Sequence, residues 1–412
     1  AINLTRRCNL ACAHCYLDAE TLKRSAPDEL TTEEVCALLD AVVERSDETM
    51  IVLTGGEPLV RPDIETIISH GAGLGLATVV GTNGTLLTDR RVLSLKKAGA
   101  LGVGISLDSL DAEIHDDFRG KPGSWRRTMN GIDACRRHDL SFQIHFTITE
   151  RTVDEIDAVI DFSKSAGARV LNVFFLICTG RAESVTDLTP ERYEEALQHL
   201  VEAQELNPDL IIRPRCAPHV KRIAHQLAPD SPMNRISGRQ GDGCIAATHY
   251  CRVTPNGGVT ACPYIAEEVG NIRIRAFFDI WDNAPEFVAL REPKLEGACG
   301  ACEYRRLCGG CRARPLAAGE GLMGADRLCG YAPRGDETIE PLAEFDLAEI
   351  AWSSDAATRL SHVPSFLRGL VRRRAEAYVA SLSESEVTTR HLSELTARRF
   401  GAGGPRHPGA TE

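Results

Sequence analysis

The chain has 412 residues, 43% of them hydrophobic, and a formal net charge of −11. This length exceeds one average compact core, so we expect two or three domains. The acidic balance argues against nucleic-acid binding, apart from a basic run at 372–374, and no apolar run is long enough to span a bilayer. We recognise no signal peptide, so we expect a cytoplasmic protein.

Residues 1 to about 215 alternate short apolar runs with amphipathic stretches. We predict strands at 2–5, 50–53, 77–80, 103–107, 142–148 and 170–176, and helices at 32–44, 63–70, 89–98, 125–137 and 153–165. Such βα units in a row predict an α/β fold, a parallel sheet with helices outside it that curls into a full or partial barrel. Function in such folds lies at the carboxyl ends of the strands.

Three cysteines follow the first predicted strand with the spacing C-x3-C-x2-C: Cys8, Cys12 and Cys15. Three thiolates can hold three irons of a [4Fe-4S] cluster and leave the fourth iron open to a small molecule. Clusters that only carry electrons usually have four cysteine ligands. A zinc site completed by His14 is the alternative, although zinc prefers paired C-x2-C ligands.

Polar and glycine residues follow the next strands at the same predicted edge. Gly55 and Gly56 come after the second strand, and small residues let a backbone approach a ligand closely. A tight strand–helix turn is the structural alternative for this motif. Asn83 follows the third strand, and Ser106 ends the fourth.

The cysteine motif followed by Gly55-Gly56-Glu57-Pro58 resembles the radical S-adenosylmethionine (SAM) superfamily. The resemblance implies a partial (β/α)6 barrel in which the open iron binds SAM and a reduced cluster cleaves it to a 5′-deoxyadenosyl radical that abstracts hydrogen. The family residue before the last cysteine is usually aromatic, but here it is His14. The SAM-binding residues implied by the resemblance are Gly55, Gly56, Glu57, Asn83, Ser106 and Arg119, the last suited to the SAM carboxylate.

A second cysteine-rich region spans residues 244–335, where long periodic helices disappear. A region with so few apolar residues has little core of its own, so we expect it to be held together by metal. Its cysteines are Cys244, Cys251, Cys262, Cys299, Cys302, Cys308, Cys311 and Cys329. The remaining cysteines stand alone and receive no functional assignment: Cys36, Cys135, Cys178 and Cys216.

This spacing resembles the SPASM extension of radical SAM enzymes, with two residues rather than the usual three before Cys311. The resemblance implies two auxiliary [4Fe-4S] clusters, hence three in all, which transfer electrons and need a reducing donor such as flavodoxin or ferredoxin. Two zinc sites are the alternative. The implied ligands are Cys244, Cys251, Cys262 and Cys311 for the first cluster, and Cys299, Cys302, Cys308 and Cys329 for the second.

A third, helical segment is predicted at 346–400, followed by a disordered tail at 401–412. The segment resembles the small C-terminal domain of the light-independent protochlorophyllide reductase B subunit, and a generic helical cap or dimerisation module is the alternative. The predicted domains are therefore a barrel at 1–215, an auxiliary-cluster domain at 216–335, and this helical domain.

Residues 3–10 and 106–120 resemble the radical SAM branch that contains haem d1 and alternative-pathway haem biosynthesis enzymes. The resemblance implies an oxidoreductase that acts on a tetrapyrrole side chain. A maturase of ribosomally made peptides is the rival, and a non-enzymatic electron carrier is disfavoured because it needs no SAM-binding Gly55–Pro58 motif. No acid–base residue is assigned; His145 lies near the predicted barrel mouth but is more simply structural.

Overall fold

The fold is known from a computed structural model. It describes residues 1–17, 19, 26–46, 48–184, 188–227, 243–340, 350–361, 363, 368, 371–372, 375–376, 378–380, 382 and 384–400. The predicted tail at 401–412 lies outside the described residues.

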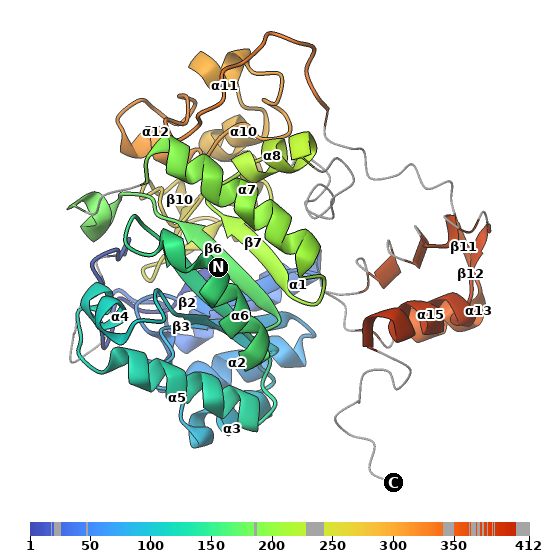
Figure 1. The fold of residues 1–412 in the computed structure, drawn as a ribbon. Coiled ribbons are helices and arrows are strands. Elements are labelled where there is room, and N and C mark those ends of the chain that lie inside the picture. The colour runs from blue at the N-terminus through green and yellow to red at the C-terminus, as the bar shows by residue number, and fades with distance from the viewer. Residues whose placement is uncertain are drawn as a thin grey trace.

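A ten-stranded sheet organises the chain, in the order β10-β9-β8-β1-β2-β3-β4-β5-β6-β7 (Figure 1). Neighbouring strands from β1 to β7 are parallel. These strands are β1 (Ile2–Asn3), β2 (Met50–Thr54), β3 (Ala77–Thr82), β4 (Gly102–Ser106), β5 (Phe142–Ile148), β6 (Val170–Phe175) and β7 (Ile211–Arg215).

Helices in the connections cover the outer side of the parallel strands. The predicted α/β fold, a parallel sheet with helices outside it, is confirmed. The helices are α1 (Thr32–Arg45), α2 (Ile64–Gly73), α3 (Asp89–Ala98), α4 (Ala112–Arg119), α5 (Ser124–Arg137), α6 (Ile156–Ala166), α7 (Pro190–Leu206) and α8 (His219–Leu227).

The sequence prediction did not include α4, α7, α8 or β7. The stretch that forms β7 contains a proline and two arginines, so it lacks the apolar pattern of a buried strand. It forms because its backbone pairs with β6 from Val170↔Ile211 to Phe174↔Arg215. Tertiary pairing therefore overrides the weak local preference.

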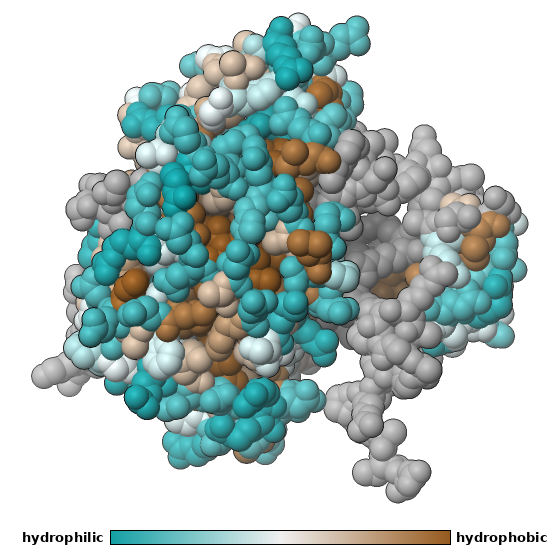
Figure 2. Space-filling view, viewed as in Figure 1, coloured by the Kyte–Doolittle hydropathy of each residue, from teal (hydrophilic) through white to brown (hydrophobic). Residues whose placement is uncertain are grey.

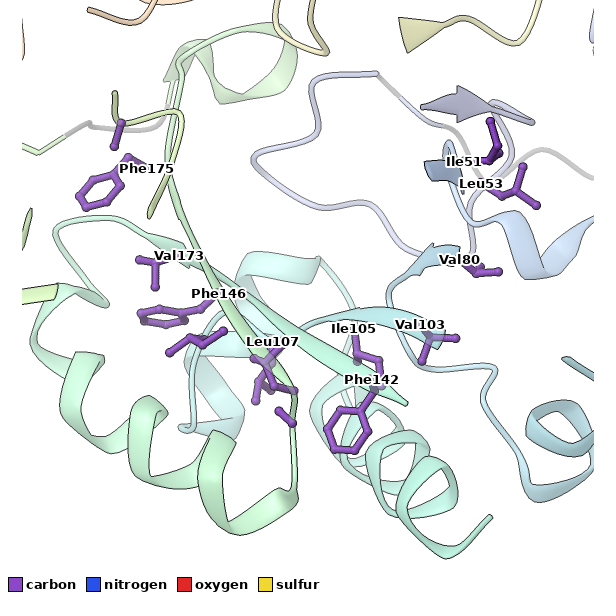
Figure 3. Packing of buried hydrophobic residues seen from close by; sticks show 14 of the residues in the cluster. Ile51, Leu53, Val80, Val103, Ile105, Leu107, Phe142, Phe146, Val173 and Phe175 are labelled. Atoms are coloured by element: carbon purple, nitrogen blue, oxygen red, sulfur yellow. The ribbon is translucent and has the colours of Figure 1, made fainter. Parts of the chain in front are cut away.

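The two faces of the parallel sheet differ in burial. Alternate residues pack against the helices and are fully buried, and Figure 3 shows Phe146 of β5 beside Val173 of β6 in this layer. The residues between them point to the concave side and are mostly half-buried, among them Ser106, His145 and Arg213.

The cysteine-rich region continues the sheet rather than forming a separate layer. Strand β8 (Arg252–Val253) pairs with β1 through Ile2↔Val253, and β9 (Gly258–Thr260) and β10 (Gly270–Asn271) follow in antiparallel order. Its helices are short: α9 (Phe277–Asn283), α10 (Pro285–Arg291), α11 (Gly297–Ala301) and α12 (Ala313–Ala317).

The C-terminal segment has its own small core, built on Ala356, Val379 and Val387. It contains α13 (Ser354–Ser361) and α15 (Thr389–Phe400), and a pair of parallel two-residue strands, β11 (Ala351–Trp352) and β12 (Glu386–Val387). The face of the molecule drawn in Figure 2 is mostly hydrophilic, with hydrophobic residues in separate patches. Within the ranges described, no helix is both long and apolar enough to cross a membrane.

Candidate functional site

The first cysteine loop lies directly after β1 and carries three free thiols. Backbone N–H groups point at two of the sulfurs, from Leu10 to Cys8 Sγ at 3.4 Å and from Ala19 to Cys15 Sγ at 3.4 Å. The guanidinium of Arg119 lies 3.6 Å from Cys12 Sγ. Donors aimed at sulfur are typical of thiolates that bind iron–sulfur clusters, because they stabilise the negative charge.

Burial makes the thiols of Cys8 and Cys12 poor acids on their own. It raises the pKa of Cys8 to about 12 and also raises the pKa of Cys12. A coordinated metal deprotonates a thiol outright, so the loop suits a cationic group better than it suits free thiolates. Across the described ranges, no three His, Cys, Asp or Glu side chains meet closely enough to hold a single metal ion.

The Gly55–Gly56 turn docks β2 against the cysteine loop. The Gly56 N–H donates to the Thr5 carbonyl at 2.8 Å, and Gly55 has a φ of +136°. A Cβ on Gly56 would lie 2.2 Å from the Arg7 carbonyl oxygen. Any larger residue would therefore separate the turn from the loop, so these glycines are required for packing here, in addition to any contact with SAM.

Glu57 is fully buried and bonded to protein donors. Its carboxylate accepts from Thr82 Oγ1 at 2.7 Å, from the Asn83 N–H at 2.8 Å and from the Leu59 N–H at 3.1 Å. These bonds connect the ends of β2 and β3. These contacts support a role for Glu57 in structuring the turn, in addition to the SAM binding that the resemblance implies.

Asn83 lies beside the cysteine loop, as the sequence predicts for a residue after β3. Its Nδ2 donates to Asn9 Oδ1 at 2.8 Å, and its Oδ1 accepts from the Thr85 N–H at 3.0 Å. The side chain is held between the loop and the strand ends, with Nδ2 4.0 Å from Cys8 Sγ.

Arg119 and Asp108 form a buried ion pair next to the loop, with Arg119 Nε 2.5 Å from Asp108 Oδ2. Burial opposes ionisation of Asp108, but Arg119 holds the pKa of its carboxyl below the usual value. Arg119 thus connects Asp108 to Cys12, a contact that its expected role at the SAM carboxylate did not include.

His14 stacks on Phe118 with ring centroids 4.3 Å apart and an angle of 7° between the planes. Burial lowers the pKa of His14 to about 4, so the ring is neutral at pH 7. A flat neutral ring can take the place of the aromatic residue that the family usually has before the last cysteine.

A row of polar residues crosses the concave face of the sheet. Strand pairing aligns Ser106 with His145, His145 with Asn172, and Asn172 with Arg213. Ser106 therefore lies in this row, on the inner side of β4. Burial, followed by the charge of Arg215, lowers the pKa of His145 to about 4, so His145 is neutral at pH 7.

Four cysteines gather at the start of the cysteine-rich region, and one of them is Cys216. Burial raises the pKa of Cys262 well above its usual value, and the neighbouring thiols of Cys216, Cys244 and Cys311 raise it further. The Tyr264 N–H lies 3.5 Å from Cys262 Sγ, and the Tyr264 side chain hydrogen-bonds to Cys216. The sequence assigned no function to Cys216, and its position directly after β7 gave no signal because the sequence did not predict that strand.

A second group contains Cys299, Cys302, Cys308 and Cys329. Burial raises the pKa of Cys308 strongly, with Cys329 and Cys299 among its neighbours. Backbone N–H groups again face sulfur: Tyr304 to Cys302 at 3.4 Å, Gly310 to Cys308 at 3.5 Å, and Asp326 to Cys299 at 3.4 Å. This is the set that the sequence predicts for one auxiliary cluster.

Cys251 lies elsewhere. Burial raises the pKa of its thiol, and the charged neighbours of that thiol are the N-terminal amine and Arg291, with no other cysteine among them. Its carbonyl accepts from the Ala1 amine at 2.8 Å. The structure thus brings together three of the four ligands predicted for the first auxiliary cluster, with Cys216 beside them and Cys251 apart.

Comparison with known families gives three matches along the chain. The model of the radical SAM superfamily matches residues 2–163, an iron–sulfur cluster-binding (SPASM) domain matches residues 244–303, and the proto-chlorophyllide reductase 57 kD subunit matches residues 352–395. The three matches lie in the regions where the sequence shows the corresponding resemblances.

Curated relatives and solved structures agree with these matches. An AdoMet-dependent heme synthase of Methanosarcina barkeri is 39% identical over 81% of this chain and 96% of its own length. One from Oleidesulfovibrio alaskensis is 35% identical, over 81% and 87%. In fold, Streptococcus suis SuiB bound to precursor peptide SuiA is similar with a TM-score of 0.64, 18% identity, and coverage of 80% of this chain and 75% of that chain.

Proposed function

We propose that this chain, which belongs to the radical SAM superfamily, oxidises a side chain of a tetrapyrrole by hydrogen abstraction. The observation that carries the proposal is the length and level of similarity to two proteins named AdoMet-dependent heme synthases. The polar row on the concave face supports it, because the few polar groups of a ligand site fix the orientation of the ligand.

We assign SAM and the first [4Fe-4S] cluster to the loop of Cys8, Cys12 and Cys15. When bound there, the pair supplies the means to abstract a hydrogen atom from an unactivated carbon. The protein's part is positioning: Gly56 holds the β2 turn on the loop, and Arg119 places a positive charge beside Cys12. Ser106 and Asn83 remain our candidates for direct contacts with SAM.

We assign two further clusters, three in all, to the cysteine-rich region. The second auxiliary cluster takes Cys299, Cys302, Cys308 and Cys329. For the first auxiliary cluster we propose Cys216 in place of Cys251, together with Cys244, Cys262 and Cys311. In support, Arg314 donates to the Cys216 carbonyl at 2.7 Å and pairs with Asp326 at 2.8 Å, and Asp326 accepts from the Cys311 N–H at 2.8 Å.

These clusters have an electron-transfer role in the proposal. After hydrogen abstraction, net oxidation requires one more electron to leave the substrate radical, and a cluster with four cysteine ligands can accept it. Asp326 contacts both groups, through Cys299 Sγ and the Cys311 N–H. A reducing donor such as flavodoxin or ferredoxin completes the cycle, and free thiols throughout fit the cytoplasm.

A peptide maturase is the second candidate. The fold it shares with SuiB, whose solved structure contains a precursor peptide, is the observation in its favour. That likeness rests on 18% identity, and a Mycofactocin maturase MftC of Mycobacterium ulcerans is 30% identical over 80% of this chain. Both values are below the 39% for a heme synthase, so we place the tetrapyrrole first.

The test is anaerobic reconstitution of the full chain, followed by iron analysis and incubation with SAM, dithionite and Fe-coproporphyrin III. We expect about 12 irons per chain, release of 5′-deoxyadenosine, and a porphyrin product of altered mass and visible absorption. Deoxyadenosine release without any porphyrin product, but with modification of a peptide encoded near this gene, would favour the maturase. Zinc in place of iron and no SAM cleavage would refute both.

A further inference from the structure

Two arginines project from β7 into the concave side of the sheet. Arg213 and Arg215 are two residues apart, so they lie on one face of the strand and about 7 Å from each other along it. Strand pairing places Arg213 beside Asn172 and Arg215 beside Phe174. Both side chains are half-buried, as expected for residues that line a space rather than fill a core.

Neither arginine faces a carboxylate of a residue that the structure describes. Over the ranges that the structure describes, the Arg213 side chain makes no hydrogen bond or ion pair, and its Nε is buried without a partner. Arg215 donates only from Nε, to Asn172 Oδ1 at 3.0 Å. Burial, and then the charge of Arg215, lowers the pKa of Arg213 to about 10.

Such an arrangement costs folding free energy. Two like charges are withdrawn from water and repel each other, and no acidic residue in the described ranges compensates them. The nearby titratable groups do not help: His145 is neutral at pH 7, and Tyr250 next to Arg215 has a pKa raised well above its usual value by burial. Uncompensated cations in a half-open site are what an anion-binding site requires before its ligand arrives.

Arg213 and Arg215 lie between the SAM-binding cysteine loop and the first auxiliary group of cysteines. His145 is close to Arg215 on one side and to Arg119 on the other, and Arg119 contacts Cys12. On its other side Arg215 is followed directly by Cys216, at the first auxiliary group. A ligand held here would be near the SAM-binding loop and near an electron acceptor at once.

We propose that Arg213 and Arg215 bind a carboxylate of the substrate, a propionate group of the tetrapyrrole. The inference rests on the proposed function for the identity of the molecule that carries the carboxylate. The planar fork of a guanidinium matches a carboxylate in two-point contact, and the Arg213 Nε has no hydrogen-bond partner among the described residues. Asn172 holds Arg215 in place for the same contact.

The test measures binding of a free-base tetrapropionate porphyrin to the reconstituted, full-length protein, by quenching of porphyrin fluorescence. The variants are Arg213→Gln, Arg215→Gln and the double variant. Arg136→Gln is the matched control, because Arg136 is an exposed arginine paired with Asp133 on α5. The tetramethyl ester of the same porphyrin and SAM itself are measured in parallel.

We expect each single variant to weaken porphyrin binding about tenfold to a hundredfold, because each removes a charge-assisted contact, and the control to leave it unchanged. The ester should bind the unaltered protein weakly and be insensitive to the variants. SAM affinity and the urea midpoint of unfolding should not fall, since neither arginine has a carboxylate partner to lose in the described structure.

Three results would overturn the inference: equal porphyrin binding by the variants, loss of SAM binding instead, or no porphyrin binding by the unaltered protein. The first leaves the proposed function standing if the porphyrin is still converted. Porphyrin binding that depends on the arginines but leads to no conversion would refute the proposed function and keep the carboxylate site.

Discussion

Replacing Cys216 or Cys251 by alanine gives a direct test of which cysteine is a ligand of the first auxiliary cluster. Cys216 lies among Cys244, Cys262 and Cys311, whereas Cys251 has only the N-terminal amine and Arg291 as charged neighbours. Cys216→Ala therefore removes one of four ligands from one of three proposed clusters. Iron should fall from about 12 to about 8 per chain, because a four-iron cluster is lost as a unit.

The assay is iron and sulfide analysis after anaerobic reconstitution, with EPR spectra of the dithionite-reduced protein. Cys251→Ala and Cys36→Ala, a half-buried cysteine on α1, are the controls and should retain about 12 irons. Full iron and an unchanged EPR spectrum in Cys216→Ala, with loss in Cys251→Ala, would refute the reasoning and restore the ligand set predicted from spacing.

Further predictions concern the buried groups around the site. Asp108→Asn leaves the buried Arg119 guanidinium without its counter-ion and should lower the free energy of unfolding by about 3–5 kcal/mol in urea titrations. The apolar double variant Asp108→Leu/Arg119→Met should lower it by less than the sum of the two single changes. Additive losses would contradict a coupled pair. Gly56→Ala should abolish both SAM binding and full iron loading because its Cβ would meet the Arg7 carbonyl. The control Gly73→Ala should leave both intact, because a Cβ there meets nothing within 4 Å. Normal iron loading of Gly56→Ala would contradict the argument and show that the turn can move. His219 is fully buried and its pKa is lowered to about 4, so below pH 6.5 the unfolded chain binds more protons than the folded chain. This residue should therefore reduce the free energy of unfolding by about 2 kcal/mol between pH 7 and pH 5. His219→Gln should show a smaller fall in urea midpoint over that range, and an equal fall would refute the role of His219.

The sequence by itself determined the regular elements of the barrel and the first cysteine loop. The predicted helix at 89–98 and strand at 142–148 match α3 and β5, because local periodicity and capping decide such elements. Thr31 and Glu34 form the capping box that starts α1 where expected. Cys8, Cys12 and Cys15 are near one another in sequence, so a short loop suffices to bring them together.

Only the tertiary structure decided which distant groups meet. Cys216 and Cys311 are neighbours because β7 and the cysteine-rich region pack on each other, whereas the family resemblance implied Cys251 instead. The lack of a counter-charge for Arg213 among the described residues is also invisible in sequence, since it depends on every element that packs around β7. Proximity across long stretches of chain is set by packing and strand pairing, and local patterns carry no record of it.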